Sequence, residues 1–388
     1  MNPYLSLIRD RKFWIPVLIL VCFDLCLQAG VYRPYLKKGS FAANVVRNTE
    51  YVLEKKAVFD PTVVLLGTSV AHQGLSLRIL NETLEPYGER MQSFAMEGTE
   101  LVVQDAIVHK LLPQFKNVHT VIHVLEVSTP WLDLQNLEIH TLSMLSELER
   151  SVAFKKIYEF DYKVNYDDLA FLTFKSVAYR RDMRDFFLDP SKRLKDIGRR
   201  RKEAKIDPWP YENPNLARIS MYPEAKDVES CLRATDPTNG QPIPQGSDHF
   251  HKKAVWDTCI LARKTPTVVG SDAAVAKFFS RLKILHDDIR RIGKQNGKEI
   301  RIIAVLAPYS DIVRAWRTPE RNRIWQEELE KIKPGMLLLD YQSSLDGSNN
   351  GDYYYDLIHL NKLGMIKFSE AMVKDLPSAL GYTGKQSK

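Results

Sequence analysis

Two short segments near opposite ends of the 388-residue chain carry residue types that together perform nucleophilic catalysis. Ser69 follows a short apolar run, residues 63–66, and is therefore expected just beyond the C-terminal end of a buried strand. Far downstream, Asp356 precedes His359 by three residues. A carboxylate at this spacing can orient an imidazole, whose other nitrogen then takes the proton of a serine hydroxyl. The pattern indicates a Ser69–His359–Asp356 centre for acyl transfer.

The same residues also have simpler structural interpretations. Serine is a common helix N-cap, so Ser69 is equally expected where a helix merely begins. Asp356 stands close to the start of another predicted helix and is a candidate cap there. If Ser69 is the nucleophile, the helix after it offers backbone N–H groups, including that of Ser69, to a developing oxyanion. His72, one turn further along that helix, is a further candidate site residue.

The elements that must position these residues follow from the hydropathy pattern. Short apolar runs predict strands, and segments with apolar residues at helical spacing predict helices. The predicted strands are residues 63–66, 91–95, 120–127, 301–306 and 336–339. The predicted helices are residues 40–55, 75–87, 100–112 and 272–292. This alternation is typical of an α/β protein with a central parallel sheet.

Residues 133–270 interrupt this alternation of strands and helices. The segment is rich in aromatic and charged residues, and it contains the basic stretch 192–205. We interpret it as a long, mostly helical or irregular insertion that covers the strand ends. Its run Arg199–Lys202 is expected to be a solvated helix face. The alternative is that this run contacts anionic lipid headgroups or an acidic glycan.

The N-terminal region favours a membrane anchor. Residues 13–32 are mostly apolar and, at 1.5 Å per residue, long enough to cross a bilayer of about 30 Å. The basic residues within 1–12 favour a cytoplasmic N-terminus, which places the main domain outside the cytoplasm. Asp24 and Gln28 are costly inside a membrane and share one helix face, so we expect them to pair with a helix of a membrane partner protein. A cleaved signal peptide and a buried soluble helix are the alternatives.

Composition narrows the class of protein. The chain has 55 Lys and Arg against 48 Asp and Glu, a net charge of +7, with 44% hydrophobic residues and a mean hydropathy of −0.28. These values exclude a mostly disordered chain and a polytopic membrane protein. The small positive excess does not indicate a nucleic-acid partner. Without a glycine-rich nucleotide motif or metal-ligand spacing, we expect no cofactor and no metal. Cys231 and Cys259 either form a disulfide or remain free thiols.

Three of these segments resemble blocks I, II and V of the SGNH/GDSL hydrolase superfamily. They are the Gly-Thr-Ser that ends at Ser69, the Gly98 of SFAMEGTE, and the DLIHLN that contains Asp356 and His359. The resemblance implies a flavodoxin-like fold, with Ser69 as nucleophile, His359 as base and Asp356 as its partner. It also implies that the backbone N–H groups of Gly98 and Ser69 bind the oxyanion. The most similar branch is membrane-anchored, extracytoplasmic and related to proteins that acylate cell-envelope polysaccharides.

The chain departs from the family pattern in one block. Block III normally carries an asparagine after the third strand, whereas this chain has Glu126 and Ser128 in the equivalent region. Loss of one oxyanion donor typically costs about 2.7–4 kcal/mol of transition-state stabilisation. Three interpretations follow: Ser128 or a backbone N–H group substitutes, the enzyme is slow, or catalysis is lost.

The resemblance therefore implies a serine esterase or O-acyltransferase that acts on a cell-envelope glycan or a lipid-linked saccharide. The alternative is a catalytically inactive SGNH-like protein that binds glycans or assembles envelope components. The expected organisation is a cytoplasmic N-terminus (1–12), a transmembrane anchor (13–32), a connecting helix (33–60), the first part of the SGNH domain (61–132), the insertion (133–270) and the second part of the SGNH domain (271–388).

Overall fold

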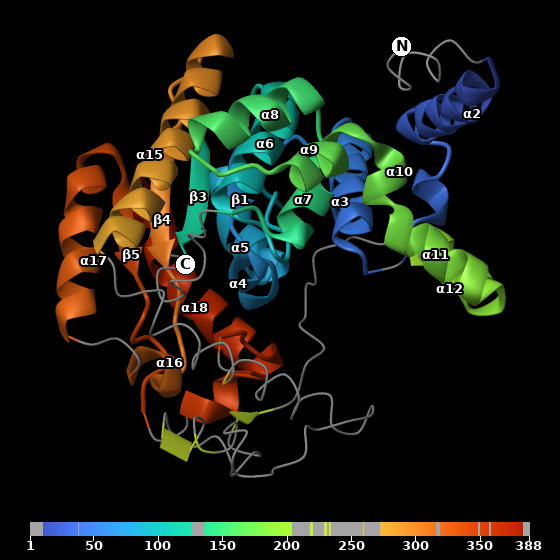
Figure 1. The fold of residues 1–388 in the computed structure, drawn as a ribbon. Coiled ribbons are helices and arrows are strands. Elements are labelled where there is room, and N and C mark those ends of the chain that lie inside the picture. The colour runs from blue at the N-terminus through green and yellow to red at the C-terminus, as the bar shows by residue number, and fades with distance from the viewer. Residues whose placement is uncertain are drawn as a thin grey trace. The chain divides into compact units, whose positions relative to one another are not determined.

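The fold was obtained as a computed structural model (Figure 1). It describes residues 11–37, 39–125, 136–203, 218–219, 229–230, 233, 259, 272–315, 319–347, 350–356 and 358–382. The chain divides into two compact units. Unit 1 comprises Met1–Tyr51 and Asn136–Pro208, and unit 2 comprises Val52–Gln135 and Trp209–Lys388.

Unit 2 is an α/β layer built on a five-stranded sheet. The strands are β1 (Val63–Leu66), β2 (Met91–Ser93), β3 (Thr120–Leu125), β4 (Arg301–Leu306) and β5 (Leu337–Asp340). Their spatial order is β2-β1-β3-β4-β5, and every neighbouring pair is parallel. All residues of β1, β2 and β3 are buried, and in β1 (Val-Val-Leu-Leu) this burial accounts for the continuous apolar run. The predicted parallel α/β architecture is confirmed.

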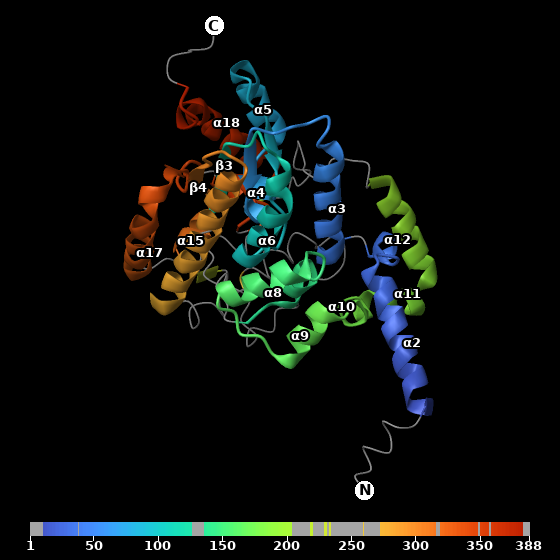
Figure 2. The same cartoon turned by 90° about the horizontal axis from the view of Figure 1, so that it is seen from above.

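Helices cover both faces of this sheet (Figure 2). On one face α5 and α18 pack against each other, and α4 also contacts α18. On the other face α15 packs against both α6 and α17. The α-helices in the described part of unit 2 are α4 (Ser69–Gly74), α5 (Leu77–Leu84), α6 (Leu101–Leu111), α15 (Asp272–Gln295), α16 (Asp311–Ala315), α17 (Pro319–Ile332) and α18 (Lys362–Ala379).

Unit 1 is helical in its described residues. Leu27, Leu36, Ala42, Ala43 and Tyr179 form one of its buried apolar clusters. The predicted insertion, residues 133–270, supplies six of the helices and lies partly outside the described residues. The α-helices among the described residues of unit 1 are α2 (Arg11–Gln28), most of α3 (Phe41–Lys55), α7 (Ile139–Leu145), α8 (Arg150–Glu159), α9 (Tyr166–Thr173), α10 (Lys175–Ala178), α11 (Arg180–Leu188) and α12 (Pro190–Glu203).

A buried ionic cluster in unit 1 joins Glu147 to Arg33, Lys175 and Tyr179. The side chain of Glu147 is fully buried and receives hydrogen bonds from Lys175 Nζ at 2.5 Å, Tyr179 Oη at 2.5 Å and Arg33 Nε at 3.3 Å. Burial lowers the pKa of Lys175, and the negative charge of Glu147 opposes that shift. An isolated buried charge would be costly, so these partners must fold together.

The helix at the N-terminus differs from the predicted membrane anchor. α2 covers residues 11–28 rather than 13–32, and it contains Pro16. Among the residues that the structure describes, no helix is both long enough and apolar enough to cross a membrane. The predicted transmembrane span is therefore unsupported.

Asp24 and Gln28 find partners within the chain rather than on a separate membrane protein. Asp24 is 5% exposed, and its Oδ1 accepts hydrogen bonds from both the backbone N–H and the hydroxyl of Ser176, each at 2.7 Å. Gln28 donates from its amide to the same carboxylate. The polar residues that were costly in a membrane helix thus fasten the end of α2 to α10.

The cysteines fall into two groups. Cys22 and Cys26 are free and exposed on α2. Cys259 is disulfide-bonded and buried, whereas its predicted partner Cys231 lies outside the described residues.

Candidate active site

Ser69 begins α4 immediately after β1, where the chain must turn sharply. Gly67 adopts φ +151°, and a Cβ there would lie 2.7 Å from the Cβ of Ala71 and 3.0 Å from the carbonyl oxygen of Val124. Glycine is therefore required for the close passage of β1 against β3. Thr68 is the N-cap of α4, with its hydroxyl accepting a hydrogen bond from the N–H of Val70. Because Thr68 caps the helix, the hydroxyl of Ser69 is available for another partner.

Asp356 and His359 form a closed turn before α18. Asp356 Oδ1 accepts hydrogen bonds from the backbone N–H groups of Ile358 at 2.8 Å and His359 at 2.7 Å. Its other oxygen, Oδ2, lies 2.7 Å from His359 Nδ1. An ionised carboxylate only accepts hydrogen bonds, so Nδ1 carries the proton and Nε2 keeps its lone pair. Asp356 thus fixes both the backbone of the turn and the tautomer of His359.

The lone pair of His359 faces the predicted nucleophile. His359 Nε2 lies 2.8 Å from Ser69 Oγ, so the serine hydroxyl donates to the imidazole. The side chains of Asp356 and His359 are 6% and 16% exposed, so the hydrogen-bonded chain is shielded yet reachable from solvent. The structure brings together Ser69, His359 and Asp356, all within unit 2.

The residues after His359 anchor this turn to α18. Asn361 is the N-cap of α18, with its Oδ1 accepting from the N–H of Gly364 at 3.0 Å and its amide donating to the carbonyl of Asp352 at 2.7 Å. A Cβ on Gly364 would lie only 2.1 Å from the carbonyl oxygen of Tyr353. The asparagine and glycine that follow His359 are therefore needed locally to hold the histidine turn in place.

Tyr355 is a site residue that the sequence did not single out. Its ring stacks on that of His359 with centroids 5.7 Å apart and an interplanar angle of 28°. Burial, together with the negative charges of Asp356 and Glu97, raises the pKa of Tyr355, so the phenol stays neutral. The stacked ring limits rotation of the imidazole. Its position next to Asp356 in the YYYD segment was the available signal.

Gly98 lies in the turn between β2 and α6, with φ +71°. This turn is bonded directly to the serine loop: the N–H of Met96 and the hydroxyl of Thr99 both donate to the carbonyl of Gly67, at 3.3 and 3.2 Å. The predicted oxyanion glycine, Gly98, thus lies in a turn that is hydrogen-bonded to Gly67, two residues before Ser69.

A series of buried, neutral side chains is hydrogen-bonded to the turn that contains Gly98. Gln104 donates from its amide to the carbonyl of Thr99 at 3.2 Å and accepts from His123 Nε2 at 2.9 Å. His123 Nδ1 in turn lies 3.0 Å from His286 Nε2. Burial lowers the pKa of His123 to about 3, and burial also lowers the pKa of His286. Both histidines are therefore neutral at ordinary pH and serve as directional hydrogen-bonding groups.

The remaining predicted site residues have different placements. His72 is on α4, with its Nδ1 3.4 Å from the carbonyl oxygen of Ala95. Glu126 and Ser128, the candidates for the block III donor, lie outside the described residues.

One cluster with metal-ligand chemistry is found among the described residues, away from this triad. Asp105 and His109 on α6 and Asp288 on α15 place their ligand atoms within 4.8 Å of one another. The guanidinium of Arg291, however, bonds to both His109 and Asp288. A resident cation already lies against the cluster, so its residues fit an ion-pair network better than a metal site.

No protein-family model matches the chain, and the search of curated proteins finds no match either.

Proposed function

We propose that the chain is an SGNH-type serine esterase or O-acyltransferase with a flavodoxin-like catalytic unit. The single observation that carries this proposal is the continuous hydrogen-bonded chain from Ser69 Oγ through His359 to Asp356. A serine that merely capped a helix would not need an oriented histidine, and Thr68 already caps α4.

The reaction would proceed in two halves. Ser69 Oγ attacks the carbonyl carbon of an ester while His359 Nε2 takes its proton, and the C–O bond to the leaving alcohol breaks as His359 returns that proton to it. In the second half, water or a sugar hydroxyl gives a proton to His359 Nε2 and attacks the acyl carbon. The bond between this carbon and Ser69 Oγ then breaks as His359 returns the proton to Oγ. Asp356 stabilises the imidazolium in both halves. The N–H groups of Ser69 and Gly98 would bind the oxyanion.

The proposed substrate is an acyl ester of a cell-envelope glycan or a lipid-linked saccharide. This choice is based on the motif resemblance and on the apolar residues of α2. Trp14, Ile15, Leu18, Ile19 and Leu20 are 44–65% exposed, and burying such residues in lipid is favourable. We therefore propose that the chain attaches to a membrane through α2, with unit 2 outside the cytoplasm.

Ester turnover tests this function. The full chain is incubated with p-nitrophenyl acetate, with and without an added oligosaccharide, and both nitrophenolate and acetylated sugar are measured. We expect turnover by the natural chain and its loss in Ser69→Ala. The matched control is Ser344→Ala, an exposed serine in the same unit that should leave turnover unchanged.

The two products separate the two halves of the proposal. Nitrophenolate alone indicates an esterase, and acetylated sugar indicates a transferase. Turnover that persists in Ser69→Ala, or none from a folded natural chain, would contradict the enzyme and favour the glycan-binding alternative.

A further inference from the structure

The hairpin of α11 and α12 in unit 1 concentrates the positive charge of the protein. Residues 180–203 contain ten Lys and Arg against five Asp and Glu, a net charge of +5 out of +7 for the whole chain. A local excess of this kind creates a field that attracts anionic surfaces.

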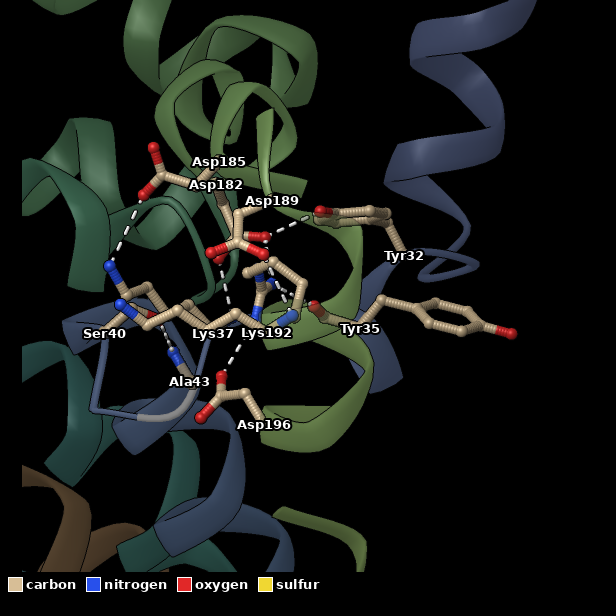
Figure 3. Close-up of polar contacts among 11 residues, drawn as sticks. Tyr32, Tyr35, Lys37, Ser40, Ala43, Asp182, Asp185, Asp189, Lys192 and Asp196 are labelled. Atoms are coloured by element: carbon tan, nitrogen blue, oxygen red, sulfur yellow. Dashed lines mark hydrogen bonds and ion pairs between the residues drawn. The ribbon is translucent and has the colours of Figure 1, made fainter. Parts of the chain in front are cut away.

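The four aspartates of the hairpin, Asp182, Asp185, Asp189 and Asp196, have hydrogen-bond or ion-pair partners inside the unit (Figure 3). Asp182 accepts from the hydroxyl of Tyr32 at 2.6 Å, and Arg193 bonds to both Asp182 and Asp196. Arg193 is only 3% exposed, so Asp182 and Asp196 are paired with a buried basic residue. The exposed basic residues are Arg180, Arg181, Arg184, Lys192, Lys195, Arg199, Arg201 and Lys202.

Apolar side chains accompany these exposed bases. Phe187 and Leu188, at the end of α11, are 82% and 74% exposed, and Leu194 on α12 is 60% exposed. A surface that binds only a polyanion gains nothing from exposed phenyl and isobutyl groups. A lipid interface uses both, since the bases meet the phosphates and the apolar groups enter the acyl boundary.

The hairpin is also fastened to the segment that follows α2. The N–H of Lys37 donates to Asp182 at 2.5 Å (Figure 3). Arg193 donates to the carbonyl of Tyr35 at 2.7 Å. Residues 32–37 follow α2 in the chain, and α2 carries exposed apolar side chains. The basic hairpin is therefore fixed next to the end of the apolar helix, so that basic and apolar side chains can meet one lipid interface together.

We propose that the α11–α12 hairpin is a binding surface for the headgroups of anionic phospholipids. This inference rests on the proposed membrane attachment through α2 but not on the serine chemistry. Lys195, Arg199 and Lys202 contact lipid phosphates, and Phe187 and Leu188 insert between the headgroups.

A fluorescent reporter on the hairpin tests the proposal in the full chain. Phe187→Cys is introduced with Cys22→Ser and Cys26→Ser, and the new thiol carries a nitrobenzoxadiazole group. Vesicles of phosphatidylcholine alone are compared with vesicles containing 30% phosphatidylglycerol. We expect a blue shift and at least a threefold rise in emission on the anionic vesicles only, and its loss when Lys195, Arg199 and Lys202 are changed to Gln.

Three controls make the result specific. Tyr158→Cys, an 86% exposed aromatic position of the same unit, should show no shift. Changing Lys283, Lys331 and Lys367 to Gln removes the same charge from exposed positions of unit 2 and should leave the shift intact. The proposal is overturned by an unchanged reporter on anionic vesicles that carry the chain, or by a stronger response to duplex DNA.

The outcomes also separate this inference from the proposed function. A chain that fails to float with either vesicle contradicts membrane attachment itself. A chain that floats without a shift at position 187 contradicts only the hairpin surface. Ser69→Ala should behave as the natural chain in both measurements, because the serine is not involved.

Discussion

His359 Nε2 lies 2.8 Å from Ser69 Oγ although 290 positions separate the two residues in the chain. Ser69 lies at the start of α4, just after β1, and His359 lies in the turn that precedes α18. The contact between α4 and α18 on one face of the sheet brings the two together. Ser69 and His359 are therefore paired only when unit 2 is folded.

The role of Asp356 is tested by Asp356→Asn. The amide oxygen can still accept the two backbone N–H groups that Asp356 Oδ1 accepts, so the turn should persist with little change in melting temperature. The negative charge opposite His359 Nδ1 is lost, and kcat for ester turnover should fall by about 10³–10⁴-fold. A kcat within tenfold of the natural value would contradict the assigned role. In Asp356→Ala, by contrast, stability should fall as well.

The role of Gly67, two residues before Ser69, is tested by Gly67→Ala. A Cβ there would lie 2.7 Å from Ala71 Cβ in a backbone conformation that disfavours other residues, so we expect a loss of about 1–3 kcal/mol in the free energy of unfolding. Activity should fall too, because Ser69 must shift. The matched control is Gly74→Ala at the end of α4, the helix that follows Gly67, where the added Cβ meets Leu360 at an ordinary 3.6 Å. Equal effects of the two changes would refute the explanation.

The buried histidines give the stability of unit 2 a definite pH dependence. Because burial lowers the pKa of His123 to about 3, only the unfolded chain takes up this proton between pH about 6.5 and 3. The free energy of unfolding should therefore be insensitive to this group above pH 6.5. Below that value it should fall as the pH drops, by up to about 1.4 kcal/mol per pH unit for each such proton.

Urea unfolding at pH 7.5, 5.5 and 4.5 measures this slope. The variant His123→Gln keeps a neutral polar side chain but removes the proton-binding group. It should unfold with a shallower loss of stability between pH 6.5 and 4.5 than the natural chain. Parallel curves for the two proteins would show that His123 does not stay neutral through burial.

β1 and β4 were predictable because a buried parallel strand is apolar on both faces, and the runs at 63–66 and 301–306 coincide with them. β2 and β5 differ from the predicted ranges 91–95 and 336–339 by one or two residues at their ends. The third predicted strand, 120–127, begins with β3, and its residues 126 and 127 lie outside the described residues. A helix was expected directly after Ser69, but the bounds of α4 were not predicted, since six residues are too short for a hydropathy period to appear. The types and spacing of Ser69, Asp356 and His359 were sufficient to single them out.

Other parts of the site and of unit 1 could not be predicted from local patterns. The chain from Thr99 through Gln104 to His123 and His286 joins residues on three separate elements, and none of its members has a distinctive neighbour in sequence. The pairing of Asp24 with Ser176 spans 152 positions. Asp24, which was expected to pair with a membrane partner protein, instead accepts a hydrogen bond from the N–H of Ser176 on α10. Such contacts depend on the tertiary fold, which periodicity alone does not give.

The most direct test of the central claim is covalent labelling of the full chain with a fluorophosphonate probe, followed by intact mass measurement. We expect a single adduct on the natural chain, none on Ser69→Ala, and labelling slowed by at least 100-fold in His359→Ala. A folded natural chain that gains no adduct, or an adduct that persists in Ser69→Ala, would contradict an activated serine at this site.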